Sequence, residues 1–213
     1  QWEANKYILY FDYNKPTNAV NPVTDITMLN KTITYDSPYG VLPTPSLLTW
    51  KFEGWYTAKT GGTPITKDSI VKVTSNQTLY AHWTPLNVNY VINYWTEKLY
   101  KDGTNDYADY TKLDSDNYSK YYSVTKTALS DSEIEIIADN QLSSNQKIYL
   151  KGFTLQNMVV DGVKNKELSA VVHINGNGQT VVDFYYKRNI YNVPDNPSDP
   201  DNNNENTIIT PGN

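Results

Sequence analysis

Apolar residues in the first part of the chain gather in short runs that are separated by turn residues. Residues 6–13 are dense in aromatic and β-branched side chains on both faces, which is typical of a central strand. Residues 25–35 alternate more loosely and predict a second strand that ends at an Asp-Ser-Pro turn. Two further strands are expected at residues 50–57 and 77–83, with Phe52, Trp55 and Tyr56 as core candidates.

The later part of the chain begins with a clearer alternation. Val88, Tyr90, Ile92 and Tyr94 alternate with mostly polar neighbours, so residues 87–95 are predicted to form a half-buried strand. The Tyr, Asp and Ser mixture at 106–122 has loosely helical spacing and predicts one short helix, whereas 147–155 is predicted as a strand. Strand-like runs at 168–174 and 179–187 flank the sequence Asn-Gly-Asn-Gly, which predicts a β-hairpin.

A set of motifs between residues 35 and 83 resembles a known repeat. The motifs are Tyr39-Gly40, Leu42-Pro43-x-Pro45, Phe52-x-Gly54-Trp55-Tyr56, Gly61-Gly62 and Thr78-Leu79-Tyr80-Ala81-His82-Trp83. In this order and spacing they resemble the Listeria–Bacteroides repeat, the family that includes the B repeat of listerial internalin. The chain departs from the family pattern in two places: it inserts a longer segment at 14–22, and it has Leu-Thr-Trp-Lys-Phe where the family has Gly-Tyr-x-Phe.

Two further features suggest a tandem array of modules. Gln1-Trp2 and His82-Trp83 are each followed by four residues and a Tyr-rich strand, so Gln1-Trp2 is interpreted as the tail of a preceding repeat. Residues 87–189 resemble the mucin-binding-protein-like repeats of Gram-positive surface proteins, through Val-x-Tyr-Val-x-x-Tyr, Lys151-Gly152-Phe153 and the closing Val-Asp-Phe-Tyr-Tyr-Lys-Arg-Asn.

These resemblances imply two tandem small β-grasp-like modules in an elongated arrangement, a mainly β fold that is α+β at most. The chain is divided into a lead-in at 1–5, a Listeria–Bacteroides-type module at 6–84, a mucin-binding-protein-like module at 85–193 and an acidic Pro/Asp/Asn linker at 194–213. The 19 Tyr and 5 Trp agree with this, because aromatic side chains suit half-buried pleated sheets.

Charge and composition exclude several classes of partner. A net charge of -5 argues against a surface that follows nucleic-acid phosphates. No apolar run approaches the ~18 residues needed to cross a bilayer, so no membrane insertion is expected within this segment. The absence of cysteine removes disulfides, thiolate zinc ligands and thiol nucleophiles.

Catalytic and metal-binding groups are scarce in the sequence. His82 occupies the variable position of Tyr-Ala-x-Trp and His173 lies within a strand-like run, and both are interpreted as structural. Glu133 and Glu135 lie two residues apart, with no reactive partner nearby in sequence, and are read as a solvated face. Residues 114–117 and 199–203 carry alternate oxygen ligands like calcium loops, but both lack the Gly and the distal Glu of the full motif. The sequence therefore predicts no enzyme, no cofactor and no metal site.

The aromatic residues divide into core and candidate surface positions. Phe52, Trp55 and Trp83 match core positions of the repeat that the first module resembles, whereas Trp50 has no such assignment. Aromatic side chains on β modules can stack on sugars or anchor protein interfaces. The candidate ligand surface consists of Trp95, Tyr107, Tyr110, Tyr118, Tyr121 and Tyr122. Solvent-exposed tyrosines without a ligand are the alternative.

Taken with the resemblances, these residues predict a non-catalytic modular segment of a bacterial cell-surface or secreted protein. It is expected to be extracellular, at the cell wall or cell surface, where it acts as a stalk or spacer and as an adhesin. Its expected partners are host or matrix proteins or glycans and the neighbouring modules of the same chain. The alternative is a carbohydrate-binding module that uses exposed Tyr and Trp side chains.

Overall fold

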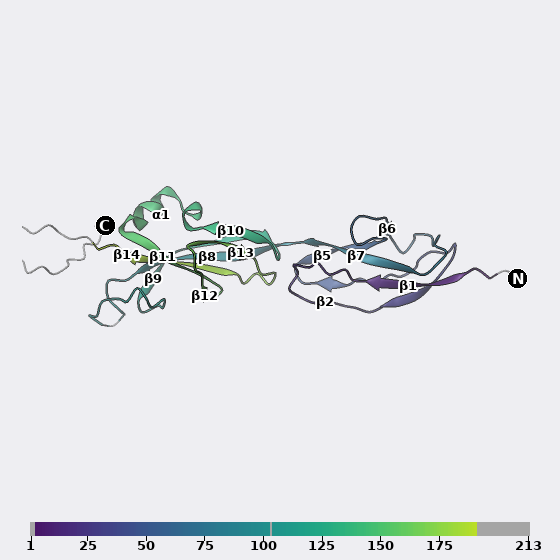
Figure 1. The fold of residues 1–213 in the computed structure, drawn as a ribbon, viewed down its shortest axis with the longest axis horizontal. Coiled ribbons are helices and arrows are strands. Elements are labelled where there is room, and N and C mark those ends of the chain that lie inside the picture. The colour runs from purple at the N-terminus through teal and green to yellow at the C-terminus, as the bar shows by residue number, and fades with distance from the viewer. Residues whose placement is uncertain (1–2, 103, 191–213) are drawn as a thin grey trace, which may run out of the picture. The chain divides into compact units, whose positions relative to one another are not determined.

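The computed structural model describes residues 3–102 and 104–190, and the backbone divides into two compact units (Figure 1). Within the described residues, unit 1 takes in 3–89, 127–132 and 173–179, and unit 2 takes in 90–102, 104–126, 133–172 and 180–190. Strands dominate both units, which confirms the mainly β fold class. The interpreted repeat tail at Gln1-Trp2 and the acidic linker at 194–213 lie outside the described residues.

Unit 1 is built on a seven-stranded mixed sheet in the order β2-β4-β5-β7-β1-β3, with β6 paired to β5. Strand β1 lies between β3, to which it is antiparallel, and β7, to which it is parallel, so its predicted central position is confirmed. The strands are β1 (Lys6–Asp12), β2 (Val23–Thr24), β3 (Asn30–Thr34), β4 (Ser46–Leu47), β5 (Trp50–Tyr56), β6 (Pro64–Ile65) and β7 (Gln77–Pro85).

The core of unit 1 surrounds Trp55, whose side chain is 2% exposed. The Trp55 ring lies 4.8 Å from the Phe11 ring, centroid to centroid, and its indole N–H donates to the Pro43 carbonyl at 2.8 Å. The other fully or largely buried members of this core are Leu9, Ile33, Tyr39, Val71, Leu79 and Ala81. Trp55 is thus the core residue that the sequence predicted, and Phe52 and Trp83 pack partly buried against the same cluster.

His82 has a structural role in unit 1. Its ring stacks on that of Tyr56, with centroids 3.8 Å apart and planes 7° from parallel. Its Nε2 atom is hydrogen bonded to the Ala58 carbonyl oxygen at 2.9 Å. The imidazole therefore packs on Tyr56 and ties the loop after β5 to β7.

Unit 2 contains most of a five-stranded sheet in the order β12-β11-β14-β8-β9 and a two-stranded sheet of β10 and β13. Strand β8 is parallel to β14, and Tyr94 lies opposite Phe184 in that register. The elements are β8 (Asn87–Glu97), β9 (Tyr118–Leu129), β10 (Glu133–Ile137), η1 (Ala138–Gln141), α1 (Ser144–Tyr149), η2 (Leu150–Gly152), β11 (Phe153–Val160), β12 (Val163–Lys164), β13 (Ser169–His173) and β14 (Val181–Arg188).

The predicted hairpin of residues 168–187 is wrong. Strand β13 pairs with β10, and β14 lies between β8 and β11. The Asn-Gly-Asn-Gly turn instead brings Gly176 close to the hydroxyl groups of Ser130 and Thr49. A Cβ atom on Gly176 would lie 2.7 Å from Ser130 Oγ. Gly176 is therefore required for close approach, and the left-handed backbone of this turn is at Gly178, with φ 71°.

The helix prediction is also corrected. Residues 104–117 form a loop that leads into β9, and the α-helix of the described residues is α1. Of residues 147–155, expected to form a strand, 147–152 lie in α1 and η2 and 153–155 begin β11. The start of α1 is a capping box: Ser143 Oγ accepts the Gln146 amide N–H, and the Gln146 side chain accepts the Ser143 N–H. The Ser-x-x-Gln spacing of residues 143–146 is the sequence signal for this helix start.

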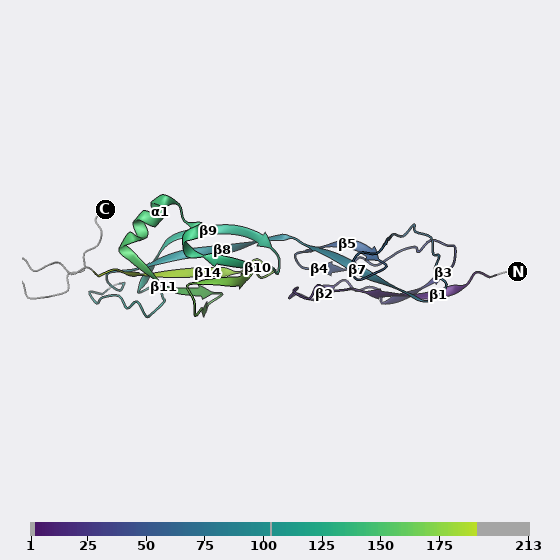
Figure 2. The ribbon, with the colours of Figure 1, turned by 45° about the horizontal axis from the view of Figure 1, so that its top comes forward.

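Helix α1 and the 104–117 loop lie on opposite sides of the five-stranded sheet (Figures 1 and 2). On the helix side, the Tyr94 hydroxyl donates to the Ala138 carbonyl of η1 at 2.7 Å. On the loop side, the Tyr118 hydroxyl donates to the Tyr110 carbonyl at 2.9 Å. No helix within the described part of the chain is long and apolar enough to span a bilayer.

Candidate binding site

The 104–117 loop is shaped by side chains that hydrogen bond to its own backbone. Asp114 Oδ1 accepts from the Asn117 side-chain amide at 2.7 Å and from the backbone N–H groups of Asp116 and Asn117 at 3.1 Å. These bonds, the Asn117 side-chain bond first, hold the pKa of the Asp114 carboxyl below its usual value. This carboxylate therefore holds the turn in the first calcium-like stretch, and the second stretch, at 199–203, lies outside the described residues.

Tyr118, predicted as a surface residue, lies in the interior of unit 2. Only 1% of it is exposed, and its ring meets that of Tyr185 edge to face at a centroid distance of 5.0 Å. Burial raises the pKa of its hydroxyl, which is bonded to the Tyr110 carbonyl. The Tyr118 side chain thus holds the loop at Tyr110 from the interior of unit 2. It is too buried to belong to the candidate ligand surface.

Tyr107 and Tyr110 line one pocket of about 200 Å³ in unit 2. Tyr107 is 60% exposed, and its ring stacks on that of Tyr100 with centroids 5.3 Å apart. One face of the Tyr110 ring is covered by the Lys187 ammonium, which lies 3.6 Å from the ring centroid. The exposed aromatic platform at this pocket is therefore the pair of Tyr100 and Tyr107.

Glu97 and Arg188 line this Tyr107 pocket, and the side chain of each is hydrogen bonded to the backbone of the other. Glu97 Oε2 accepts the backbone N–H of Arg188 at 2.7 Å, and the Glu97 carbonyl accepts from Arg188 Nη2 at 3.0 Å. Burial raises the pKa of the Glu97 carboxyl, and the Arg188 bond lowers it by less. The Glu97 carboxylate and one terminal nitrogen of Arg188 are thus held by backbone groups, whereas Arg188 Nε has no hydrogen-bond partner among the described residues.

The other candidate residues do not join this pocket. Trp95 donates its indole N–H to Asp183 at 2.7 Å, and its ring stacks on Tyr185 at a centroid distance of 5.9 Å. Tyr121 stacks on Tyr149 of α1 at 4.1 Å, and Tyr122 packs 5.9 Å from Tyr94. The six predicted residues therefore do not form a single surface, and of these six Tyr107 and Tyr110 are the two that line the same pocket.

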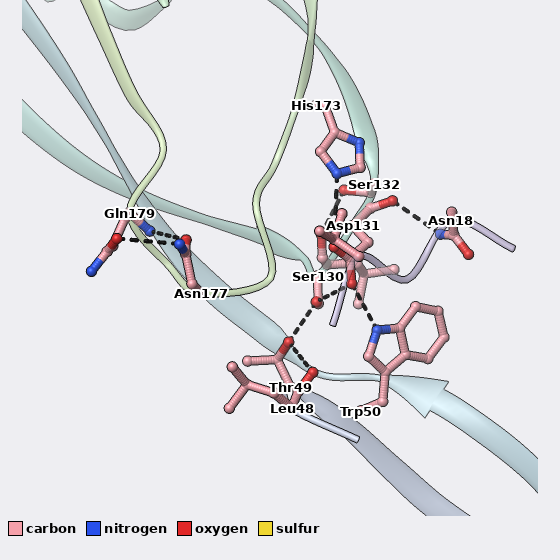
Figure 3. A network of polar contacts seen from close by, with 12 residues as sticks. Asn18, Leu48, Thr49, Trp50, Ser130, Asp131, Ser132, His173, Asn177 and Gln179 are labelled. Carbon is pink, nitrogen blue, oxygen red and sulfur yellow. Dashed lines mark hydrogen bonds and ion pairs between the residues drawn. The ribbon is translucent and has the colours of Figure 1, made fainter. Parts of the chain in front are cut away.

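A second polar cluster lies within unit 1, around Asp131 (Figure 3). Asp131 is 2% exposed and has a left-handed backbone with φ 54°, which is uncommon outside glycine. Its Oδ2 atom accepts from the Trp50 indole at 2.8 Å and from the Ser130 hydroxyl at 2.9 Å. Its carbonyl accepts from the Asn18 side-chain amide at 2.9 Å. We call these residues, together with Thr49 and His173, the Asp131 cluster.

The order of groups in the Asp131 cluster differs from that of a hydrolytic triad. A triad needs the imidazole next to the hydroxyl, with the carboxylate behind it. Here the carboxylate lies between them, because Ser130 contacts Asp131 Oδ2, and His173 Nε2 lies 3.7 Å from Asp131 Oδ1. Ser130 is also only 1% exposed. The cluster links four segments of unit 1, at Asn18, at Thr49 and Trp50, at Ser130 and Asp131, and at His173.

Sequence reasoning missed Glu97, Lys187, Arg188 and Asp131. Glu97 and Arg188 are 91 positions apart, and the parallel pairing of β8 with β14 brings them together. That pairing has no local signature. Among the described residues, no group of three or more His, Asp or Glu side chains is placed to hold a metal ion.

Comparison with known proteins supports the first module. A search of curated proteins finds no match to the chain. The resemblance of the second module to mucin-binding-protein repeats remains a prediction. Residues 7–82, roughly a third of the chain and most of unit 1, match the family model of the Listeria-Bacteroides repeat domain, which occurs in bacterial surface proteins.

Proposed function

We propose that the chain is a non-catalytic segment of a bacterial cell-surface or secreted protein, where it acts as a mechanically resistant stalk and supports adhesion. The repeat match at residues 7–82 supports the surface location. The observation that carries the stalk role is the strand order, because in each unit the first and last long strands are neighbours and run parallel.

Parallel neighbours determine how tension acts on each unit. In unit 1 the chain enters through β1 and leaves through β7, whose paired residues run from Leu9 and Gln77 to Asp12 and Tyr80. Tension at these two ends slides the strands along each other, so the ladder of hydrogen bonds is loaded together and not one bond at a time. In unit 2 the β8–β14 pairs run from Val91 and Val181 to Thr96 and Tyr186. Forced unfolding follows the rate of that rupture.

Single-molecule pulling tests this stalk role in unit 1. The chain has no cysteine, so introduced thiols give unique attachment points. The pair Lys6→Cys and Thr84→Cys loads β1 and β7 in shear, and the pair Lys6→Cys and Ser75→Cys peels them apart. We expect the shear pair to unfold at clearly higher force. Equal forces in the two geometries would argue against the stalk role, and matched thermal unfolding controls for damage by the substitutions.

The β-grasp assignment of both modules is part of this proposal. A mixed sheet with the first and last strands parallel at its centre occurs in both units, and unit 2 adds α1 across one face. This topology supports the resemblance of the second module to β-grasp repeats. A backbone NMR map of strand pairings would test it, since β8–β14 contacts are the distinguishing feature.

A carbohydrate-binding role is the second candidate, and the exposed stack of Tyr100 on Tyr107 favours it. Aromatic faces bind sugar rings by stacking, and the adjacent pocket offers the polar groups of Lys187 and Arg188. A glycan array with the intact chain is the direct test. Binding that is lost in Tyr107→Ala and retained in Tyr10→Ala, a similarly exposed tyrosine of unit 1, would support this role. An array without any hit would dismiss it.

A further inference from the structure

A second and larger pocket, of about 580 Å³, lies in unit 2. It is formed by η1, α1 and η2 together with β10, β11, β13 and β14, and it shares no lining residue with the Tyr107 pocket. Its volume falls in the range of small-molecule sites. The apolar part of its lining consists of Ile137, Leu142, Leu150, Phe153, Leu155 and Leu168.

The hydroxyl of Tyr186 is the unusual group in this Leu150 pocket. Tyr186 is only 5% exposed, and its hydroxyl oxygen has no hydrogen-bond partner among the described residues. Buried polar groups are nearly always bonded, so an unbonded one in a pocket wall points to a missing partner. Burial, and then the nearby Asp139, raise the pKa of this hydroxyl, so it remains protonated and available as a donor.

Charged side chains add a second requirement for a ligand. Lys147 of α1 and Lys151 of η2 line the pocket, with Asp139 as the acidic member. Neither ammonium group takes part in a salt bridge or side-chain hydrogen bond formed by the described residues. The two lysines outnumber the single carboxylate, and the pocket therefore favours an anionic group.

We propose that the Leu150 pocket binds an organic carboxylate with an apolar body. The apolar body packs against the leucines and Phe153, and the carboxylate meets Lys147 and Lys151 and accepts a hydrogen bond from Tyr186. The largely aliphatic wall disfavours a sugar, whose hydroxyl groups would lose water without replacement. The same chemistry is offered by a free apolar acid and by the C-terminal apolar residue of a peptide.

Titration of the intact chain, followed by amide chemical shifts, tests this proposal. The probes are octanoate for the free acid, N-acetylphenylalanine for the peptide end and N-acetylphenylalaninamide as the uncharged control. We expect saturable shifts at Leu150, Thr154 and Tyr186 with at least one acid, and weaker or no binding of the amide. Which acid binds better identifies the source. Absence of saturable shifts with both acids, or equal binding of acid and amide, would overturn the proposal.

Variants separate ligand contacts from effects on folding. Tyr186→Phe removes only the unbonded hydroxyl, so the free protein should be as stable as the parent or more stable. The same change should weaken probe binding by about 3- to 10-fold, the effect of one hydrogen bond. Lys147→Gln with Lys151→Gln should weaken binding further, whereas Lys164→Gln, an exposed lysine outside the pocket, should not. Unchanged affinity in Tyr186→Phe would exclude the assigned role of that hydroxyl.

Discussion

The two units bury their largest aromatic side chains in different ways. Unit 1 centres on the Trp55 indole, surrounded by Phe11, Tyr13 and Phe52, and its one polar atom is bonded to the Pro43 carbonyl. Unit 1 also buries Tyr39, whose hydroxyl donates to Gln77, whereas unit 2 is richer in buried tyrosines, among them Tyr94, Tyr118, Tyr185 and Tyr186. The hydroxyls of Tyr94 and Tyr118 each hold an irregular segment, on opposite sides of the sheet.

This difference indicates how each unit tolerates added function. In unit 1 the Tyr13 hydroxyl donates to the Met28 carbonyl, and the Asp131 cluster holds other irregular segments. The tyrosine-rich core of unit 2 fixes its loops through hydroxyl bonds, and it also places Tyr186, whose hydroxyl has no partner among the described residues, in the lining of a pocket. Both of the pockets discussed above as ligand sites therefore lie in unit 2, next to segments held by tyrosines.

The largest expected effect comes from removing the central indole of unit 1. Trp55→Ala removes a 2%-exposed ring and an indole hydrogen bond, and should lower the free energy of unfolding by about 3–5 kcal/mol. Urea unfolding of the variant and of Val41→Ala, whose side chain is 75% exposed, gives the comparison. A loss below about 1 kcal/mol in Trp55→Ala would mean that this ring does not organise unit 1.

A smaller loss of stability is expected at Gly176, where the backbone lies too close to its neighbours to leave room for a side chain. Gly176→Ala places a Cβ atom 2.7 Å from Ser130 Oγ and 2.9 Å from Thr49 Oγ1, and should cost about 1–3 kcal/mol of unfolding free energy. Gly178 provides the matched control, because its constraint is φ 71° and its Cβ would have room. Asn tolerates a left-handed backbone, so Gly178→Asn should be better tolerated than Gly178→Ala. Gly176→Asn should be worse than Gly176→Ala, and the reverse order would contradict the close-approach explanation.

The buried tyrosines of unit 2 should make the free energy of unfolding depend on pH in alkaline solution. Burial, and then the charges of Asp183 and Asp114, raise the pKa of Tyr185 from 10.0 to about 12. An acid whose pKa is raised by folding stabilises the folded state below its unfolded pKa, and this contribution is lost as pH rises toward the folded pKa. Between pH 10 and about 12 the Tyr185 contribution should therefore fall by up to ~1.4 kcal/mol per pH unit.

Unfolding curves of the parent chain and Tyr185→Phe across this pH range measure that contribution. The two stabilities should converge, or cross in favour of the variant, as pH rises, and Tyr10→Phe should follow the parent because Tyr10 is 44% exposed. Parallel pH dependence of parent and Tyr185→Phe would show that this hydroxyl titrates normally. Tyrosinate absorbance in the folded range provides an independent reading of the same ionisation.

Local patterns in the sequence predicted strands well and partners poorly. The two-sided apolar run of β1 marked a central strand because a strand covered on both faces needs apolar residues on both. The Asn-Gly-Asn-Gly turn misled because turn residues report backbone freedom and not which strands pair. Tyr118 was misplaced because Tyr is amphipathic, and its burial depends on the Tyr110 carbonyl that the loop brings to it. Glu97 and Arg188 could not be linked without the β8–β14 register.

The smallest expected effect concerns α1, which has no buried residue of its own. A six-residue helix is too short to be stable through backbone bonds alone, so the Ser143 and Gln146 capping box should supply much of its order. Ser143→Ala should cost about 1 kcal/mol, confined to local opening of the helix. Amide hydrogen exchange at Lys147 should accelerate by about 5-fold, while exchange at Phe184 should not change.

Two substitutions make the capping test specific. Ser143→Asp keeps a side-chain acceptor at the N-cap and should retain protection, whereas Ser144→Ala, one residue further on, removes no cap and should have little effect. Because Lys147 lines the Leu150 pocket, fraying of α1 in Ser143→Ala should also weaken carboxylate binding there, with Ser143→Asp restoring it. Faster exchange without any change in probe affinity would separate the order of the helix from the pocket, and would leave Lys151 and Tyr186 as the groups that hold the carboxylate.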